Sequence, residues 1–166
     1  MDLPLILTAV FVALGLLALA SVWLARPKTP PNWIIVDGSN VLYWDQNLAD
    51  MATVARVIRH LEAEGFVPVV WFDRNVGYRI GDRFLKEVDL ADLLTLRKTQ
   101  VFLAGKDTPA DPWVLAQARD LKAMIVTNDR YRDWAEAHPE VQEPGLLIRG
   151  RVQGSAVTLD LPLKQT

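Results

Sequence analysis

Short apolar runs that alternate with longer amphipathic segments constrain the fold of this chain more than any other feature. Residues 33–36 are fully apolar and are bounded by Asn32 and by Asp37 and Gly38, as expected of a strand that is buried on both faces of a parallel sheet. Similar runs predict strands at residues 66–72, 100–103 and 124–127. Four buried strands of this kind need helices on both faces of the sheet.

The segments between these runs have helical periodicity. Residues 48–64 place four apolar side chains on one helical face and end before Gly65, a common residue after a helix: Met51, Val54, Ile58 and Leu61. A second helical stretch carries Leu85, Val88, Leu93 and Leu96. Residues 110–122 predict a helix with Asp111 as N-cap and Pro112 in the first turn. A further helix is expected over residues 130–137, and final strands over 146–149 and 156–161. Strands that alternate with helices predict an α/β fold with an open, mostly parallel, doubly wound sheet.

Acidic side chains follow several of the predicted strands. In a doubly wound sheet, a ligand binds beyond the carboxyl ends of the strands, where the strand order reverses. Asp37, Asp73 and Asp129 each come after a strand, and Asp111 opens a helix on the same side. Carboxylates that gather at one edge repel one another unless a cation lies among them. The pattern therefore predicts a divalent-metal site and points to phosphodiester chemistry, with Asp73 as a secondary candidate because its strand could end to one side.

Three segments of the chain resemble a known family of nucleases. They are IIVDGSNV at residues 34–41, the helix that opens at Asp111, and IVTNDRYRDW at residues 125–134. Together they resemble the NYN-type, PIN-like ribonucleases, particularly the Regnase-like branch, over roughly residues 33–150. The resemblance implies a PIN-like fold, a single-stranded or structured RNA substrate and a Mg²⁺ or Mn²⁺ cofactor.

The resemblance also implies which residues form the site. It assigns the acidic positions to Asp37, Asp111, Asp129 and Asp133, with Asn40 beside them. Members of the branch often have two adjacent carboxylates where this chain has Ala110 and Asp111, so this site has one ligand fewer.

The chemistry of magnesium suggests a role for each of these residues. Because Mg²⁺ keeps several waters, a few direct carboxylates suffice, and we expect Asp37 and Asp129 to be the direct ligands. Asp111 and Asp133 would orient water, sharing one helix face with Asp129 if a helix begins there, and Asn40 would hydrogen-bond phosphate or water. Further contacts to the substrate are expected from Ser39, Asn40, Lys106, Arg130 and Arg132.

Each of these acidic residues also has a structural interpretation. Asp37 could cap the turn that follows it, and Asp111 could cap a helix. Asp129 and Asp133 could pair with neighbouring arginines. A polar loop also offers several residues that could follow an RNA backbone and stack a base, although scattered solvated charge is an equally good interpretation: Arg74, Tyr78, Arg79 and Arg83.

The amino-terminal segment predicts a membrane anchor. Residues 3–25 contain no charge, and 23 residues are enough to cross a hydrocarbon core of about 30 Å as a helix. A cleaved signal peptide is the alternative, but the start of the chain has no Lys or Arg before the apolar run. Arg26 and Lys28 flank the far end, which favours a single pass with the catalytic domain in the cytoplasm. The predicted organisation is a transmembrane helix (1–25), a Pro-rich tether (26–32) and a nuclease domain (33–166).

Composition excludes several other functions. The chain has no Cys and only two His, His60 and His138, which excludes disulfide scaffolds, thiolate zinc sites and cysteine nucleophiles. The net charge of -2 lacks the basic footprint of many nucleic-acid-binding proteins, so phosphate must be met by local Arg and Lys or by metal.

The prediction is therefore a membrane-anchored, metal-dependent endoribonuclease that hydrolyses RNA with metal-activated water. A module of the same fold that binds RNA without cutting it is the main rival. A phosphatase with Asp37 as nucleophile normally needs a second carboxylate two residues on, where this chain has Ser39. A DNA-directed nuclease stays open because no residue pattern reads a 2′-hydroxyl. The sequence does not decide whether the protein forms a homo-oligomer.

Overall fold

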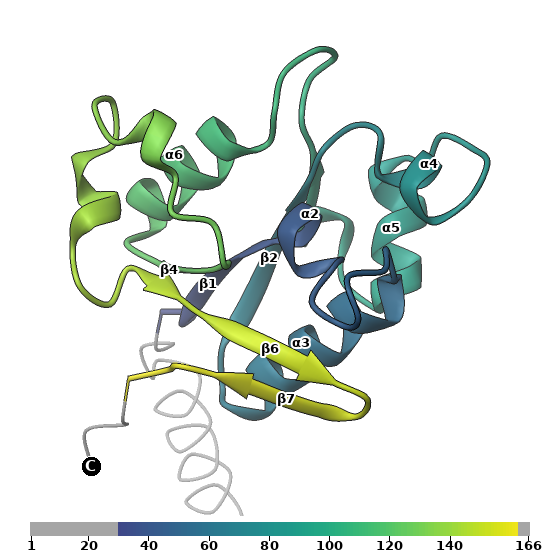
Figure 1. The fold of residues 1–166 in the computed structure, drawn as a ribbon, viewed down its shortest axis with the longest axis horizontal. Helices are drawn as coiled ribbons and strands as arrows, with labels where there is room; N and C mark the ends of the chain where they lie inside the picture. The colour runs from purple at the N-terminus through teal and green to yellow at the C-terminus, as the bar shows by residue number, and fades with distance from the viewer. Residues whose placement is uncertain (1–29, 163–166) are drawn as a thin grey trace, which may run out of the picture. The chain divides into compact units, whose positions relative to one another are not determined.

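Strands and helices alternate along the part of the chain, residues 30–162, that the computed structural model describes (Figure 1). The elements are β1 (Trp33–Asp37), α2 (Gly38–Val41), α3 (Met51–Ala63), β2 (Val67–Phe72), α4 (Val76–Ile80), α5 (Glu87–Leu94), β3 (Val101–Leu103), α6 (Asp111–Leu121), β4 (Met124–Val126), β5 (Leu147–Ile148), β6 (Gly150–Gln153) and β7 (Ala156–Leu159). Three short 3₁₀ turns complete the set: η1 (Lys98–Gln100), η2 (Arg132–Trp134) and η3 (Pro139–Gln142).

The central sheet has five parallel strands in the order β3-β2-β1-β4-β5. The chain builds outward from β1 in one direction through β2 and β3, and in the other through β4 and β5. The order therefore reverses between β1 and β4, which places the carboxyl ends of these two strands at the topological switch point. The predicted α/β fold with a mostly parallel, doubly wound sheet is confirmed.

Helices cover both faces of this sheet, with α6 on one side and α3 and α5 on the other (Figure 1). Side chains of β1 alternate between the two layers: Ile34 packs into the core beneath α3 and α5, and Ile35 packs into the core beneath α6. Both are completely buried. Burial on both faces explains why the strands are continuous apolar runs rather than alternating ones.

Two helices differ from the prediction in position or facing. Helix α3 begins at Met51 rather than at residue 48, because the Asp50 carboxylate accepts hydrogen bonds from the backbone of Ala52 and Thr53 and so caps the helix there. In α5, the expected apolar face is wrong at Val88 and Leu93, whose side chains are exposed. The buried side of α5 is formed by Leu90, Ala91 and Leu94.

The segment after β4 does not form the helix predicted over residues 130–137. Only the 3₁₀ turn η2 is present, and Tyr131 just before it has a left-handed backbone with φ of 49°. The Asp129 carboxylate accepts a hydrogen bond from the Tyr131 backbone at 2.7 Å, which closes a tight turn in place of a helical one. The Tyr131 side chain then turns inward and is buried.

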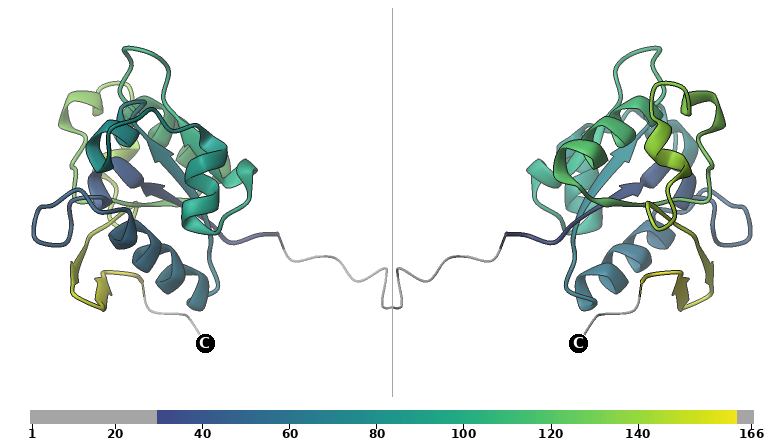
Figure 2. Two further views of the ribbon diagram at one scale, coloured as in Figure 1. Left: turned by 90° about the vertical axis from the view of Figure 1, so that its right-hand side faces the viewer. Right: turned by 90° about the vertical axis from the view of Figure 1, so that its left-hand side faces the viewer.

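The final strands also pair differently from a simple extension of the sheet. Strands β6 and β7 form a separate antiparallel hairpin. This hairpin lies next to α3 (Figure 2). The predicted strand at residues 146–149 is present in the main sheet as the shorter β5.

The predicted membrane segment at residues 3–25 lies outside the described residues, as does most of the predicted tether. Within residues 30–162, no helix is both long enough and apolar enough to cross a membrane. From Pro31 onward the described residues belong to one compact unit.

Candidate active site

The Asp37 carboxylate lies at the switch point and is held by three hydrogen bonds. The backbone N–H of Asn40 donates to Oδ1 at 3.1 Å. The Thr127 hydroxyl and the Tyr131 phenol donate to Oδ2 at 3.0 and 2.9 Å. Because Asn40 follows β1 and Thr127 follows β4, donors from both sides of the switch point fix the orientation of Asp37.

Burial makes the negative charge of Asp37 unfavourable. Only 4% of the residue is exposed, and this burial raises its pKa from 3.8 to about 6, although the hydrogen bonds from Asn40, Tyr131 and Thr127 act in the opposite direction. The nearby Asp111 carboxylate raises the pKa further. Burial and the Asp37 charge also raise the pKa of Tyr131 well above its usual value, so Tyr131 remains a protonated donor.

Asp111 interacts electrostatically with three other carboxylates, those of Asp37, Asp73 and Asp129. Burial raises the pKa of Asp111, the Trp134 indole at 3.0 Å from Oδ2 lowers it, and the charges of Asp129 and Asp73 raise it again. Asp37 and Asp111 also interact. Asp73, only a secondary candidate from the sequence, therefore belongs to the same acidic group. Its Oδ1 accepts a hydrogen bond from the backbone of Ala110 at 2.9 Å.

Asp111 does not cap its helix as predicted. The N-cap of α6 is Ala110, and Asp111 lies in the first helical turn with Pro112 beside it. Its carboxylate is therefore free of the capping role and accepts the Trp134 indole N–H instead. The structural interpretation of Asp111 as the cap of its helix is therefore wrong.

The side chain of Asn40 is fixed by two donors on its oxygen. The Trp44 indole N–H and the Asn128 backbone N–H both donate to Asn40 Oδ1 at 2.8 Å. This pattern assigns the amide orientation, because only the oxygen can accept from both. Within residues 30–162, the NH₂ group of Asn40 makes no hydrogen bond and is available as a donor. Ser39, which precedes Asn40, accepts a hydrogen bond from the Asp73 backbone at 2.8 Å.

The remaining predicted residues lie at the periphery. Asp133 is exposed on η2, and among residues 30–162 its carboxylate joins no hydrogen bond or ion pair. Because the left-handed backbone of Tyr131 prevents a continuous helix between Asp129 and Asp133, these two residues do not share a helix face, and that expectation is wrong. Arg130 and Arg132 are exposed around the same turn. Lys106 is exposed on the loop between β3 and α6.

The acidic group has the donor chemistry of a divalent-cation site. In the described part of the chain, no three acidic or His side chains are already close enough to enclose a metal ion together. The available groups are nevertheless all carboxylate oxygens, which suit Mg²⁺ and Mn²⁺. The charges of Asp73 and Asp129 raise the pKa of Asp111, and the charge of Asp111 raises the pKa of Asp37, a repulsion that a bound cation would relieve.

Two hollows lie next to the acidic group. A groove of about 600 Å³ is lined by Asp73 and by residues of α4 and of the loop that precedes α6. A hollow of about 170 Å³ contains Ser39, Asp73 and Arg79.

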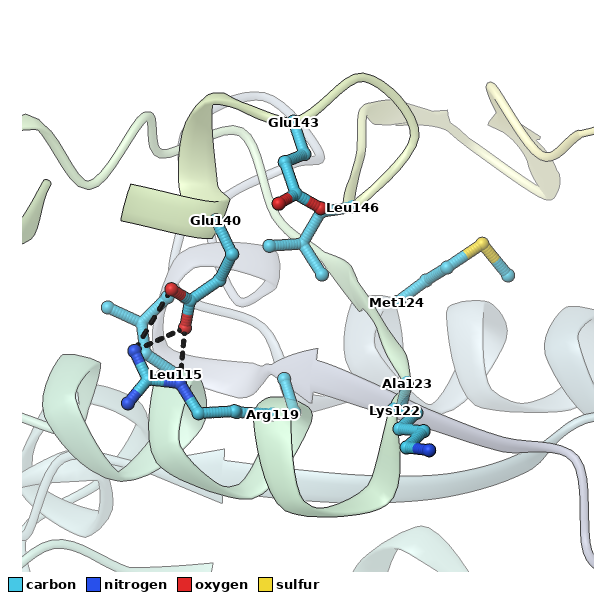
Figure 3. Close-up of a pocket in the computed structure, with 9 residues that line it drawn as sticks. Leu115, Arg119, Lys122, Ala123, Met124, Glu140, Glu143 and Leu146 are labelled. Atoms are coloured by element: carbon cyan, nitrogen blue, oxygen red, sulfur yellow. Dashed lines mark hydrogen bonds and ion pairs between the residues drawn. The ribbon is translucent and has the colours of Figure 1, made fainter. Parts of the chain in front are cut away.

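A third hollow, of about 380 Å³, lies between α6 and the segment that leads to β5, and the Arg119–Glu140 ion pair lies on its wall (Figure 3). It adjoins the amino end of β4 at Met124, the opposite edge of the sheet from the carboxylates.

Sequence reasoning missed three residues that hold the site together. The side chains of Thr127 and Tyr131 donate hydrogen bonds to Asp37, and that of Trp134 donates one to Asp111. All three lie after β4, in the segment from Thr127 to Trp134, whose other residues are polar. The only signal was the presence of two aromatic side chains within that polar segment.

Comparisons with known proteins support the fold described above. Residues 31–145 match the model of the Zc3h12a-like Ribonuclease NYN domain. Two solved structures of nuclear protein-only RNase P 2 from Arabidopsis thaliana superimpose with TM-scores of 0.62 and 0.59, at 18% and 17% identity, and cover 95% and 94% of this chain. The chain spans only 36% and 35% of those two structures, so they show a shared fold alone. No curated protein matches the chain significantly.

Proposed function

Because the chain belongs to the Zc3h12a-like ribonuclease NYN family, we propose that it is a divalent-metal-dependent endoribonuclease that hydrolyses phosphodiester bonds of single-stranded RNA. The observation that carries this proposal is that Asp111 interacts with three other carboxylates, Asp37, Asp73 and Asp129, at the carboxyl edge of the sheet. A purely structural site would pair these charges with Arg or Lys. Instead, the hydrogen bonds to Asp37 and Asp111 come from neutral donors.

The proposed metal ligands are Asp37 and Asp129, with Asp111 and Asp133 acting through water. Asp73 adds a carboxylate beside the backbone of Ala110 and so supplies the negative charge that a second adjacent carboxylate would have contributed there. A bound Mg²⁺ or Mn²⁺ would polarise the scissile phosphate and lower the pKa of an attacking water. No covalent enzyme intermediate is needed.

The protein's own groups position the reactants. Thr127 and Tyr131 hold the Asp37 carboxylate in one orientation. The free NH₂ of Asn40 is proposed to donate to a phosphate oxygen. Lys106, Arg130 and Arg132 are exposed, and Lys106 lines the same groove as Asp73; we propose that all three neutralise neighbouring phosphates.

A direct test of this proposal is RNA cleavage by the purified full-length protein. We expect single-stranded RNA to be cut internally with Mg²⁺ or Mn²⁺ and to remain intact in excess EDTA. A DNA strand of the same sequence distinguishes a ribonuclease from a nuclease with broader specificity. Binding of RNA with no cleavage under any metal condition would favour the non-catalytic module, and cleavage that persists in EDTA would exclude the proposed chemistry.

The indole of Trp44 is expected to affect turnover through Asn40. In Trp44→Phe the ring is kept but the N–H donor to Asn40 is lost, so the amide is held only by the Asn128 backbone. We expect kcat to fall about 10-fold with little change in KM, as for other groups that orient a catalytic side chain. The control is the pair of Asn40→Ala and Asn40→Ala/Trp44→Phe, which should be equally slow. Additive losses in the double variant would show that Trp44 does not act through Asn40.

We further propose that residues 3–25 anchor the protein in a membrane with its catalytic domain in the cytoplasm. The support is the uncharged 23-residue run followed by Arg26 and Lys28. In cell fractionation, the full chain should remain in the membrane pellet after alkaline carbonate extraction, and a chain that starts at residue 30 should be soluble. Release of the full chain by carbonate, or a mature protein that has lost residues 1–20, would contradict the anchor.

A further inference from the structure

The groove of about 600 Å³ beside the acidic group combines aromatic rings with charged side chains of both signs, the basic Arg74 and Lys106 and the acidic Asp73 and Asp107. Its walls come from the turn between β2 and α4, from α4, from the loop that follows α4, and from the loop between β3 and α6, all of which lie beyond the carboxyl ends of β2 and β3 (Figure 1). The side chains that matter for its chemistry are Arg74, Tyr78, Phe84 and Lys106. Its volume falls within the range of about 300–1,000 Å³ typical of pockets that hold small ligands.

The aromatic side chains of this groove are unusually accessible. Tyr78 is 61% exposed and Phe84 is 37% exposed, whereas most large apolar side chains of the described residues are buried. The Arg74 guanidinium lies over the Phe84 ring at 5.0 Å from its centroid. A stacked guanidinium and an open phenol ring are the surfaces on which proteins stack unpaired nucleic-acid bases.

The groove is continuous with the proposed cleavage site. Asp73 lines the groove and is also one of the three carboxylates that interact with Asp111. The smaller hollow that holds Ser39 and Arg79 shares Asp73 and Asn75 with the groove. A chain of nucleotides that placed one phosphate at the carboxylates would therefore place a neighbouring nucleotide in the groove.

We propose that this groove binds one unstacked nucleotide of single-stranded RNA next to the scissile phosphate. The base stacks against Tyr78 and the Arg74–Phe84 pair, and Arg74 and Lys106 neutralise the adjoining phosphate. This inference rests on the proposed ribonuclease function and adds a base-stacking subsite beside the scissile phosphate.

The test uses short single-stranded RNAs that each carry 2-aminopurine, a fluorescent base, at a different position. Full-length Asp129→Asn protein in Mg²⁺ provides an inactive background for titration. We expect the fluorescence to be quenched at one or two positions next to the cleavage site, where the base stacks. Tyr78→Ala should bind about 10-fold more weakly and lose this quenching, in line with the loss of one stacked base.

Matched variants separate stacking from general effects. Tyr78→Phe keeps the ring and should bind and quench like the parent protein. Leu48→Ala removes an apolar side chain that is 64% exposed and lines none of the hollows described above, and it should also bind normally. Replacing Phe84 with Leu removes the second ring and should weaken binding as Tyr78→Ala does.

Cleavage by the protein with an intact Asp129, measured in parallel, separates failure of the groove from failure of the function. If that protein cuts RNA and Tyr78→Ala binds within twofold of the parent with quenching retained, the groove proposal is wrong and the ribonuclease function stands. If the protein neither cuts nor binds RNA, the ribonuclease function fails and the groove proposal fails with it.

Discussion

Replacing Asp37 with Asn is expected to make the protein more stable and nearly inactive. The substitution removes a proposed metal ligand, and cleavage should fall by about 10²-fold or more. The amide keeps the size of the carboxylate, and its NH₂ can donate to the Thr127 and Tyr131 hydroxyls, which accept as well as donate. The free energy of unfolding should rise because a buried negative charge disappears.

The expected gain in stability depends on pH. Burial raises the pKa of Asp37 to about 6, so the folded protein keeps a proton that the unfolded chain releases from about pH 4 upward. The parent protein should therefore lose stability as the pH rises from about 4 to 6, by about 3 kcal/mol for a rise of two pKa units. The Asn variant lacks this group and should not show that loss.

Denaturant unfolding at pH 4.5 and 7.5, in EDTA, measures this difference. The Arg119–Glu140 ion pair lowers the pKa of Glu140 to about 2 and therefore makes stability change with pH in the opposite direction. The pair is present in both proteins, so its contribution cancels in the difference between them. Asp82→Asn, at an exposed position away from the carboxylate group, is the control for removal of one negative charge. A variant that cleaves RNA normally, or one that keeps the full pH dependence of the parent, would contradict the assignment of Asp37.

Gly38→Ala is expected to be the most destabilising small substitution in the turn after β1. A Cβ at this position would lie 2.4 Å from one ring carbon of Phe72 and 2.7 Å from another. Phe72 is completely buried in the core beneath α3 and α5, so its ring can move away only by displacing packed neighbours. We expect a loss of about 3 kcal/mol, at the upper end for an overpacked core, and a fall in Tm of about 10 °C.

Thermal unfolding of Gly38→Ala beside Gly81→Ala measures this effect. A Cβ at Gly81 meets its nearest neighbour at 3.7 Å, so that variant should unfold like the parent. Phe72→Leu combined with Gly38→Ala should recover part of the loss, since the shorter side chain makes space. Equal stability of the two alanine variants would show that the close approach of Gly38 to Phe72 is not a constraint on the fold.

The strands were predictable because their residues are dictated by burial on both faces. Ile34, Ile35 and Val36 are all completely buried, and no other secondary structure of that length explains a short apolar run that ends in Asp and Gly. Helix boundaries were predicted within a few residues. The facing of α5 was not, because its buried side is set by contacts with α3 and β3 that are distant in sequence.

The candidate site was predictable at strand ends and unpredictable in the turns. Asp37 and Asp129 lie at and just after the ends of β1 and β4, and parallel strands deliver their carboxyl ends to one edge of the sheet, where Asp111 begins α6. The prediction for the segment after β4 was wrong because helical propensity carries no information on the hydrogen bond from the Tyr131 phenol to Asp37. That contact joins residues 94 positions apart, and it fixes a left-handed turn that only the folded structure reveals.

Manganese binding by the purified full-length protein tests the central claim most directly. Calorimetric titration in the absence of RNA should show saturable binding of Mn²⁺ that tightens as the pH rises through about 6, where Asp37 ionises. Asp129→Asn and Asp37→Asn should each bind at least about 10-fold more weakly, with Asp82→Asn unchanged. Binding that is absent in the parent protein, or equal in all four proteins, would contradict a metal site built from these carboxylates.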